Sequence, residues 1–201
     1  MEDPPPAVVS AYVPVLGPQF CSPNHVDLTV TKSPISLSGG DFVVTDSDGG
    51  VVFKVQGRAM RVRDRRVLVD AVGNPILTMK EKLRSLHKRW QVYRGDSTES
   101  KELLFSVKRS SFLQVLTELH VFMAQHSRED VCDFKVFGNY SDRMCTVSLA
   151  NSSAAIAQMS RKYTVTNLLL HKDTFKVTVF PNVDCAFIIA LIVILDVITK
   201  K

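Results

Sequence analysis

Short apolar segments recur along most of the chain. Between Val26 and Pro181 the sequence holds about twelve segments of five to eight residues that are rich in Val, Ile, Thr and Phe, a composition and length typical of β-strands. Turn-forming pairs such as Gly73 with Asn74 separate them, and no helical stretch connects them, so the pattern predicts an antiparallel meander. The expected strands span 26–32, 42–46, 51–55, 66–70, 75–79, 90–95, 103–109, 119–124, 133–138, 145–150, 155–162 and 175–180.

The C-terminal segment has a different pattern. Residues 185–195 are eleven consecutive apolar residues, Asp184 is a suitable N-cap, and Lys200 with Lys201 suits the negative end of a helix dipole, so a helix is predicted over about 184–198. Such a helix is roughly 16 to 21 Å long, shorter than the roughly 30 Å of a membrane's hydrocarbon core, and is not expected to be transmembrane. A helix that is apolar on every side has to be enclosed, and a closed barrel of strands can enclose it.

Two of the hairpins form a weak internal repeat. The first unit reads VTDSDGGVVFKV and the second, 24 residues later, reads LVDAVGNPILTM, so that Asp46 aligns with Asp70 and Gly49 with Gly73. An acid and a glycine at this spacing are typical of Asx turns, in which the carboxylate accepts hydrogen bonds from the following backbone N–H groups. A calcium loop is excluded, because its glycine would stand at another position and its closing glutamate is absent.

Positive charge is concentrated in one part of the chain. The formal net charge is +5, but the stretch from Lys54 to Arg94 holds twelve Lys or Arg residues and three acidic residues, which favours an anionic partner. Three interpretations stay open: a solvated rim with ion pairs through Asp64 and Glu81, a site for anionic lipid or a phosphorylated partner, and a nucleic-acid site. The last is disfavoured, because exposed aromatics and a reading helix are not evident. The candidate residues for an anionic ligand are Arg61, Arg63, Lys80, Lys82, Arg84, Lys88, Arg89, Lys108 and Arg109.

The sequence resembles the LURP-one-related proteins of plants. The resemblance covers roughly residues 24–198 and is carried by FVVTDSDGGVVFKV, RRVLVDAVGNPILTMKEK, HKRWQVYRG, LLFSVKRSS and VTVFPNVDCAFIIALIVILD. It implies a mainly-β, tubby-like fold of the kind attributed to phospholipid scramblases: a closed antiparallel barrel of about twelve strands around an apolar C-terminal helix. It also implies a link to plant defence and, by analogy, tethering at a membrane.

Tubby domains hold a phosphoinositide headgroup with a Lys and an Arg two positions apart, followed by Ser and Asn. The comparable place here reads Val107, Lys108, Arg109, Ser110, Ser111. Arg109 matches, whereas the lysine is displaced by one residue. On a strand this displacement turns Lys108 to the opposite face from Arg109, so direct transfer of the tubby site is not expected.

The N-terminal segment is rich in proline. Six of the nine prolines lie in the first 23 residues, which predicts a flexible tail over 1–23 and a barrel domain over 24–201. No secretory signal is evident, and four cysteines without a CxxC pair indicate free thiols in a reducing compartment. We therefore expect an intracellular, cytosolic protein that is not secreted. Cys21 is a candidate for lipidation.

No sequence motif indicates catalysis. The five histidines are dispersed, and GxSxG, HExxH and GxxxxGK[ST] are absent, so we expect no catalytic residues, metal or cofactor. Trp90 is expected to pack in or over the barrel. The sequence predicts a monomeric, non-enzymatic binding or regulatory module that associates peripherally with anionic, phosphoinositide-like membrane lipids. The alternative is a protein-interaction or transcription-associated regulator without a lipid ligand.

Overall fold

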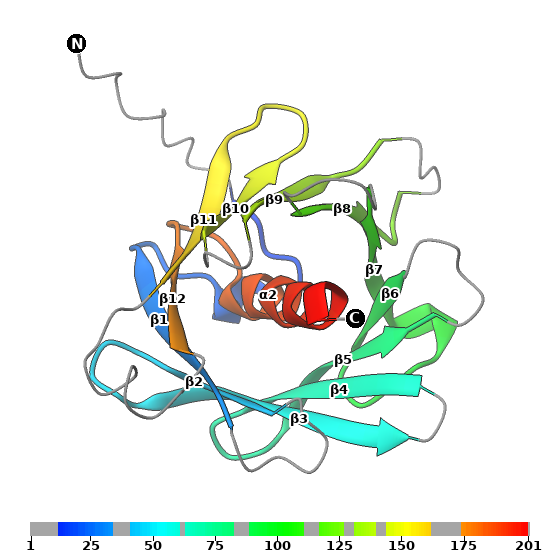
Figure 1. Ribbon diagram of the computed structural model, residues 1–201, viewed down its shortest axis with the longest axis horizontal. Helices are drawn as coiled ribbons and strands as arrows, with labels where there is room; N and C mark the ends of the chain where they lie inside the picture. The colour runs from blue at the N-terminus through cyan, green and yellow to red at the C-terminus, as the bar shows by residue number, and fades with distance from the viewer. Residues whose placement is uncertain are drawn as a thin grey trace.

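The computed structural model describes residues 12–33, 41–60, 63–82, 89–110, 117–126, 131–139, 144–161 and 174–200. Twelve antiparallel strands close into a barrel around helix α2 (Figure 1), so the predicted fold is confirmed. The strands are β1 (Val26–Lys32), β2 (Phe42–Thr45), β3 (Val51–Met60), β4 (Arg63–Asp70), β5 (Pro75–Glu81), β6 (Trp90–Arg94), β7 (Leu103–Arg109), β8 (Thr117–Met123), β9 (Phe134–Asn139), β10 (Met144–Leu149), β11 (Ala155–Arg161) and β12 (Thr174–Val179). Helix α2 spans Cys185–Lys200, and two short 3₁₀ helices, η1 and η2, span Pro18–Phe20 and Ser100–Glu102.

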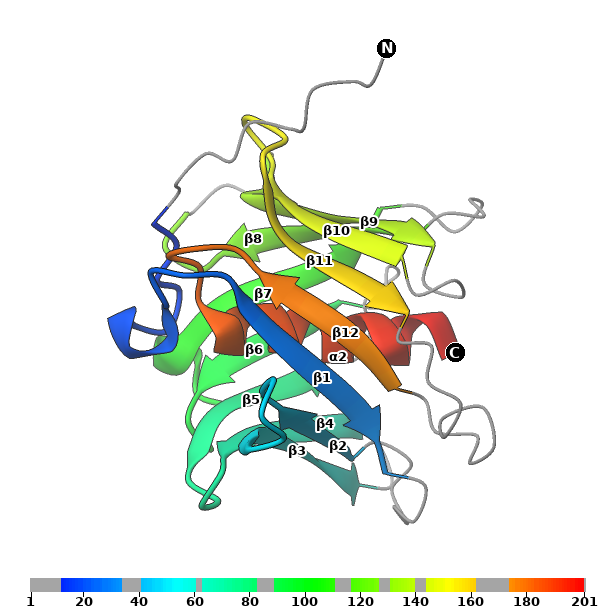
Figure 2. The same ribbon diagram turned by 90° about the vertical axis from the view of Figure 1, so that its left-hand side faces the viewer.

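The two ends of the barrel differ. Each strand pairs with its neighbours in sequence, and β1 closes the barrel against β12, so all odd-numbered strands finish at one end. The C-terminal part of α2 lies at that end, since Lys32 Nζ of β1 lies 3.4 Å from Asp196 Oδ2 of the helix. In Figure 2 the arrowheads of β1, β9 and β11 and the C-terminus all lie toward the right. We call this the Asp196 end, and the opposite end, where α2 begins, the Asp184 end.

Helix α2 fills the interior of the barrel. Every residue from Cys185 to Ile198 is buried, which explains why the helix is apolar on all sides. The ring of Phe187 lies 5.1 Å from that of Phe105 and 5.0 Å from that of Phe134, measured between centroids. Trp90 is 1% exposed and belongs to the same core, as predicted. The core is therefore formed between strand side chains and a central helix.

A segment before β1 packs across the Asp184 end. Val13 N donates to the Asn182 carbonyl at 2.9 Å, Asp184 N donates to the Val13 carbonyl at 3.1 Å, and Leu16 is only 5% exposed. Residues 12–21, which we call the strap, thus belong to the packed structure, although the sequence assigns them to a flexible tail. The difference arises because apolar Val13 and Leu16 reach the core between the prolines. Residues 1–11 of the expected tail lie outside the described residues.

Both repeat units form the predicted Asx turns. Asp46 Oδ1 accepts hydrogen bonds from the Asp48 and Gly50 N–H groups at 3.0 and 2.7 Å. Asp70 Oδ1 accepts from the Gly73 N–H at 2.7 Å and also from the N–H groups of the two flanking residues. Gly73 has a φ of 104°, a backbone conformation that favours glycine. The two repeat units therefore share the same kind of turn, in which an aspartate side chain accepts hydrogen bonds from the following backbone N–H groups.

Replacing Asp70 should make the stability of the protein depend differently on pH. Hydrogen bonds, first that of the Asn74 side-chain amide, lower the pKa of Asp70. Its contribution is therefore complete above the usual aspartate pKa of about 4 and is lost as pH falls through the lowered value. We expect Asp70→Ala to lower the thermal midpoint at neutral pH. Asp70→Asn should lower it less, and the gap to wild type should close in acid; a gap unchanged by acid would contradict this assignment.

Candidate functional site

The structure gathers most of the predicted cationic residues at the Asp196 end. The ends of β3, β5 and β7 and the starts of β4, β6 and β8 lie next to one another there. Arg63 begins β4, and exposed Lys82 follows β5, where its N–H donates to the Arg89 carbonyl at 2.8 Å. The candidates Arg61, Arg84 and Lys88 lie outside the described residues.

The outer surface of the barrel carries Lys80 and Lys108. Lys80 pairs across strands with Arg65 and Gln91, and Lys108 lies opposite His120. Arg65 forms an ion pair with Asp96. By contrast, Lys80, Lys82 and Lys108 form no ion pair within the part of the chain that the structure describes. Their charges are therefore available to a ligand.

Two arginines face the inside of the barrel instead. Arg109 lies opposite Leu119, a fully buried core residue, so its side chain is on the inner face. Arg66 lies opposite the core residue Met79 and is 6% exposed. Lys108 and Arg109 thus point to opposite faces, as the strand period predicts, and do not form one surface site.

The Asp184 end carries the opposite charge. The turns at this end hold the acidic residues Asp46, Asp48, Asp70, Asp96, Glu99, Glu102 and Asp133. Two described cations of this end are engaged: Arg94 donates to the Leu16 carbonyl at 3.0 Å, and Lys101 pairs with Glu99 at 2.9 Å. Among the side chains that the structure describes at the Asp196 end, the acids Asp41, Glu81, Glu118 and Asp196 are outnumbered by Lys32, Arg66, Lys80, Lys82, Arg89, Lys108 and Arg109. The barrel is therefore polarised along its axis.

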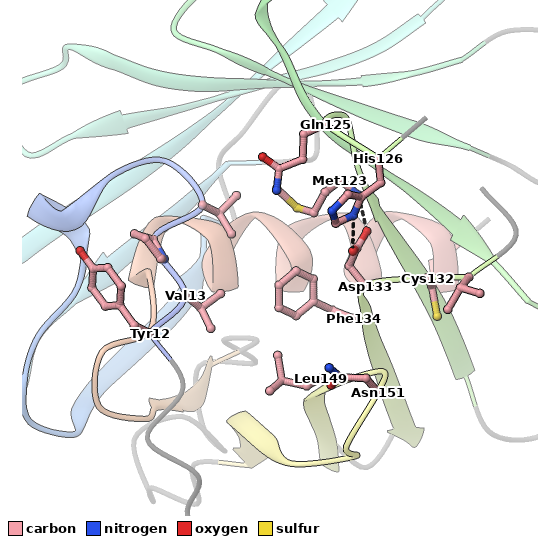
Figure 3. A pocket seen from close by; sticks show the side chains of 13 residues that line it. Tyr12, Val13, Met123, Gln125, His126, Cys132, Asp133, Phe134, Leu149 and Asn151 are labelled. Atoms are coloured by element: carbon pink, nitrogen blue, oxygen red, sulfur yellow. Dashed lines mark hydrogen bonds and ion pairs between the residues drawn. The ribbon is translucent and has the colours of Figure 1, made fainter. Parts of the chain in front are cut away.

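A second candidate site is a pocket at the Asp184 end. A cavity of about 750 Å³ opens between the strap and the ends of β8, β9 and β10 (Figure 3). Val13, Met123, Phe134 and Leu149 give it apolar walls. A volume of this size is typical of small-molecule sites.

One wall of this pocket holds an oriented histidine. His126 Nδ1 lies 2.6 Å from Asp133 Oδ1, and Asp133 Oδ2 accepts a hydrogen bond from the Met123 N–H at 2.7 Å. The neighbouring thiol is not activated, because burial raises the pKa of Cys132 and keeps it protonated. The arrangement can hold a hydrogen-bonding group of a ligand, but its lining residues include no thiolate nucleophile.

The other sequence-based expectations concern cysteines, metals and membrane spans. All four cysteines are free thiols, as predicted. Cys21 lies in the strap, with its sulfur 3.9 Å from the carbonyl oxygens of Val13 and Gly17, and burial followed by the charge of Asp184 raises its pKa. No cluster of three potential metal ligands occurs in the described ranges. Among the same residues, no helix has the length and apolarity needed to cross a membrane.

Comparison with known proteins gives consistent results. The profile of the LURP-one-related family matches residues 26–196. Protein LURP-one-related 15 of Arabidopsis thaliana is 46% identical over 187 residues, which are 93% of this chain and 86% of that protein. Protein LURP-one-related 10 of the same plant is 44% identical over 188 residues, 93% of this chain and 97% of that one. An X-ray structure of an Arabidopsis thaliana protein superposes with a TM-score of 0.74 at 39% identity, covering 94% of this chain and 99% of that chain.

Proposed function

The chain belongs to the LURP-one-related family, and from this premise we propose that it is a non-catalytic binding module, acting in plant defence signalling, that associates peripherally with anionic membrane lipids. The Asp196 end is the lipid-binding surface. The module acts through its charge and not through a reaction, because neither candidate site presents an activated nucleophile among its described residues.

The observation that carries the proposal is the charge polarity of the barrel. Lys80, Lys82 and Lys108 lie at the end where cations outnumber acids, while the acidic turns lie at the other end. An anionic surface would attract the first end and repel the second, which orients the domain before contact. Each Lys or Arg near an anionic membrane contributes about 1 kcal/mol, so a few such residues give reversible binding.

Removing three cations from the Asp196 end should weaken membrane binding. We expect Lys80→Ala, Lys82→Ala and Lys108→Ala together to reduce cosedimentation with phosphoinositide-containing liposomes about 100-fold at low salt. The matched control replaces Lys54, Lys101 and Lys176 with Ala. It removes the same charge elsewhere on the barrel and should leave binding nearly unchanged.

Salt dependence gives the second arm of this experiment. Binding by exposed charges should weaken steeply from low to physiological salt. Equal binding by the two triple variants would reject the Asp196 end as the lipid surface. Failure of wild type to sediment with any anionic liposome would reject lipid binding, and the alternative, a protein-binding regulator, would then be favoured.

A further inference from the structure

Two exposed apolar side chains stand side by side at the Asp196 end. Phe137 on β9 is 48% exposed and Met144 on β10 is 67% exposed. Their neighbours Val136 and Cys145 face the core, so Phe137 and Met144 face outward. Met144 pairs with Asn139, two residues beyond Phe137, which makes the two apolar residues diagonal neighbours on one face, within reach of each other.

A row of basic side chains lies directly behind this apolar pair. Lys108, His120 and Lys135 are cross-strand partners on β7, β8 and β9. Lys135 precedes Phe137 by two residues on the same face, a step of about 7 Å along the strand away from the barrel end. The acid opposite Phe137 is Glu118. It is compensated, because its Oε1 lies 2.9 Å from His120 Nε2 and 4.0 Å from Lys135 Nζ.

We propose that Phe137 and Met144 form an insertion tip that enters the boundary between headgroups and acyl chains of an anionic bilayer, while Lys108 and Lys135 contact the phosphates. This inference rests on the proposed function and narrows it: the ligand is a bilayer surface and not a free phosphorylated solute. Single exposed apolar side chains are ordinary. Here the two are adjacent and are backed by lysines, which is the arrangement that favours interfacial binding.

The location of the pair supports a bilayer as the partner. Other exposed apolar residues, such as Val72 at 84% and Val131 at 77%, lie at the Asp184 end, among the acidic turns. An anionic membrane would be repelled there. Only at the Asp196 end, within the part of the chain that the structure describes, do exposed apolar and uncompensated cationic side chains occur together.

A tryptophan placed at the tip would report its depth. We compare Phe137→Trp with Val72→Trp, using liposomes of phosphatidylcholine and phosphatidylserine whose acyl chains carry bromine, a short-range quencher. The native Trp90 is buried in both variants and serves as an internal reference. We expect a blue shift and quenching for Phe137→Trp only. Cosedimentation without extra quenching at position 137 would overturn the insertion tip while leaving charge-based binding intact.

Polar substitution tests the energetic contribution of the tip. Phe137→Ser should weaken liposome partitioning about tenfold, and Met144→Ser by a similar factor, whereas Val72→Ser should have no effect. The sites are exposed, so the variants should fold. Inositol hexakisphosphate as a soluble probe should not distinguish Phe137→Ser from wild type. A similar loss of binding to this probe, or no loss with liposomes, would overturn the inference, and failure of wild type to bind liposomes would reject it together with the proposed function.

Discussion

Replacing Asp184 with alanine should destabilise the protein by about 2–4 kcal/mol, measured as the free energy of unfolding in urea. Asp184 is fully buried and caps α2, since its Oδ1 accepts the Phe187 N–H at 2.9 Å. Its Oδ2 accepts the Leu16 N–H of the strap at 2.7 Å and the Gly17 N–H at 3.4 Å. The substitution would therefore leave buried donors of two segments without their acceptor.

The pH dependence of stability distinguishes the hydrogen bonds that Asp184 accepts from the effect of its negative charge. Burial raises the pKa of Asp184, so its contribution is complete below the usual aspartate pKa of about 4 and declines as pH rises through the raised value. Asp184→Asn should not show this decline. The control Asp48→Ala, in an exposed turn, should change stability by less than about 0.5 kcal/mol. A similarly small effect of Asp184→Ala would contradict the double role of this carboxylate.

The strands and the central helix could be predicted because their signals are local. Each strand pairs with the next one along the chain, so alternation and turn residues determine most of the topology, as at Asp46 and Asp70. The closing pair β1–β12 is long-range. It was nevertheless implied, because the apolar run beginning at Cys185 has to be enclosed. The N-cap could be predicted because Asp184, a residue type that often caps helices, directly precedes this apolar run.

The strap could not be predicted, because its partners are distant in sequence. Leu16 bonds to a residue 168 positions away, and the prolines around Val13 are typical of a tail. The apolar residues of the strap were the available signal. The strap is held in place by Asn182 and Asp184, and these residues come close to it only once the chain has folded.

The candidate site was predictable in part. The stretch from Lys54 to Arg94 predicts a cationic surface, and the strand period separates Lys108 from Arg109, which the structure places on opposite faces of β7. The acidic Asp184 end was missed, although its residues occupy the turns after even-numbered strands, because ends can be assigned only after the strand order is known. The pocket beside His126 combines segments far apart in sequence and leaves no local pattern.

Replacing Phe187 with alanine should cost about 3–5 kcal/mol of unfolding free energy, the range found for a fully buried core phenylalanine. Phe187 is fully buried, and its ring packs on those of Phe105 and Phe134. Those partners belong to strands of a closed hydrogen-bonded barrel, which has no free edge and cannot collapse inward to fill the space. The cavity left by Phe187→Ala would therefore persist, and the decrease in unfolding free energy would include the full cost of that cavity.

A matched control is available on the outside of the same barrel. Phe137→Ala makes the same chemical change at a site that is 48% exposed, and should alter stability by no more than about 0.5 kcal/mol. Phe187→Leu should lower the unfolding free energy by an intermediate amount, about 1–1.5 kcal/mol, because it leaves a smaller void than Phe187→Ala. If Phe187→Ala cost no more than Phe137→Ala, the helix would not be the core of this domain. If instead Phe187→Ala costs most, Phe187→Leu less and Phe137→Ala least, α2 is the core element around which the barrel closes. The two candidate sites then lie at the two ends of this helix.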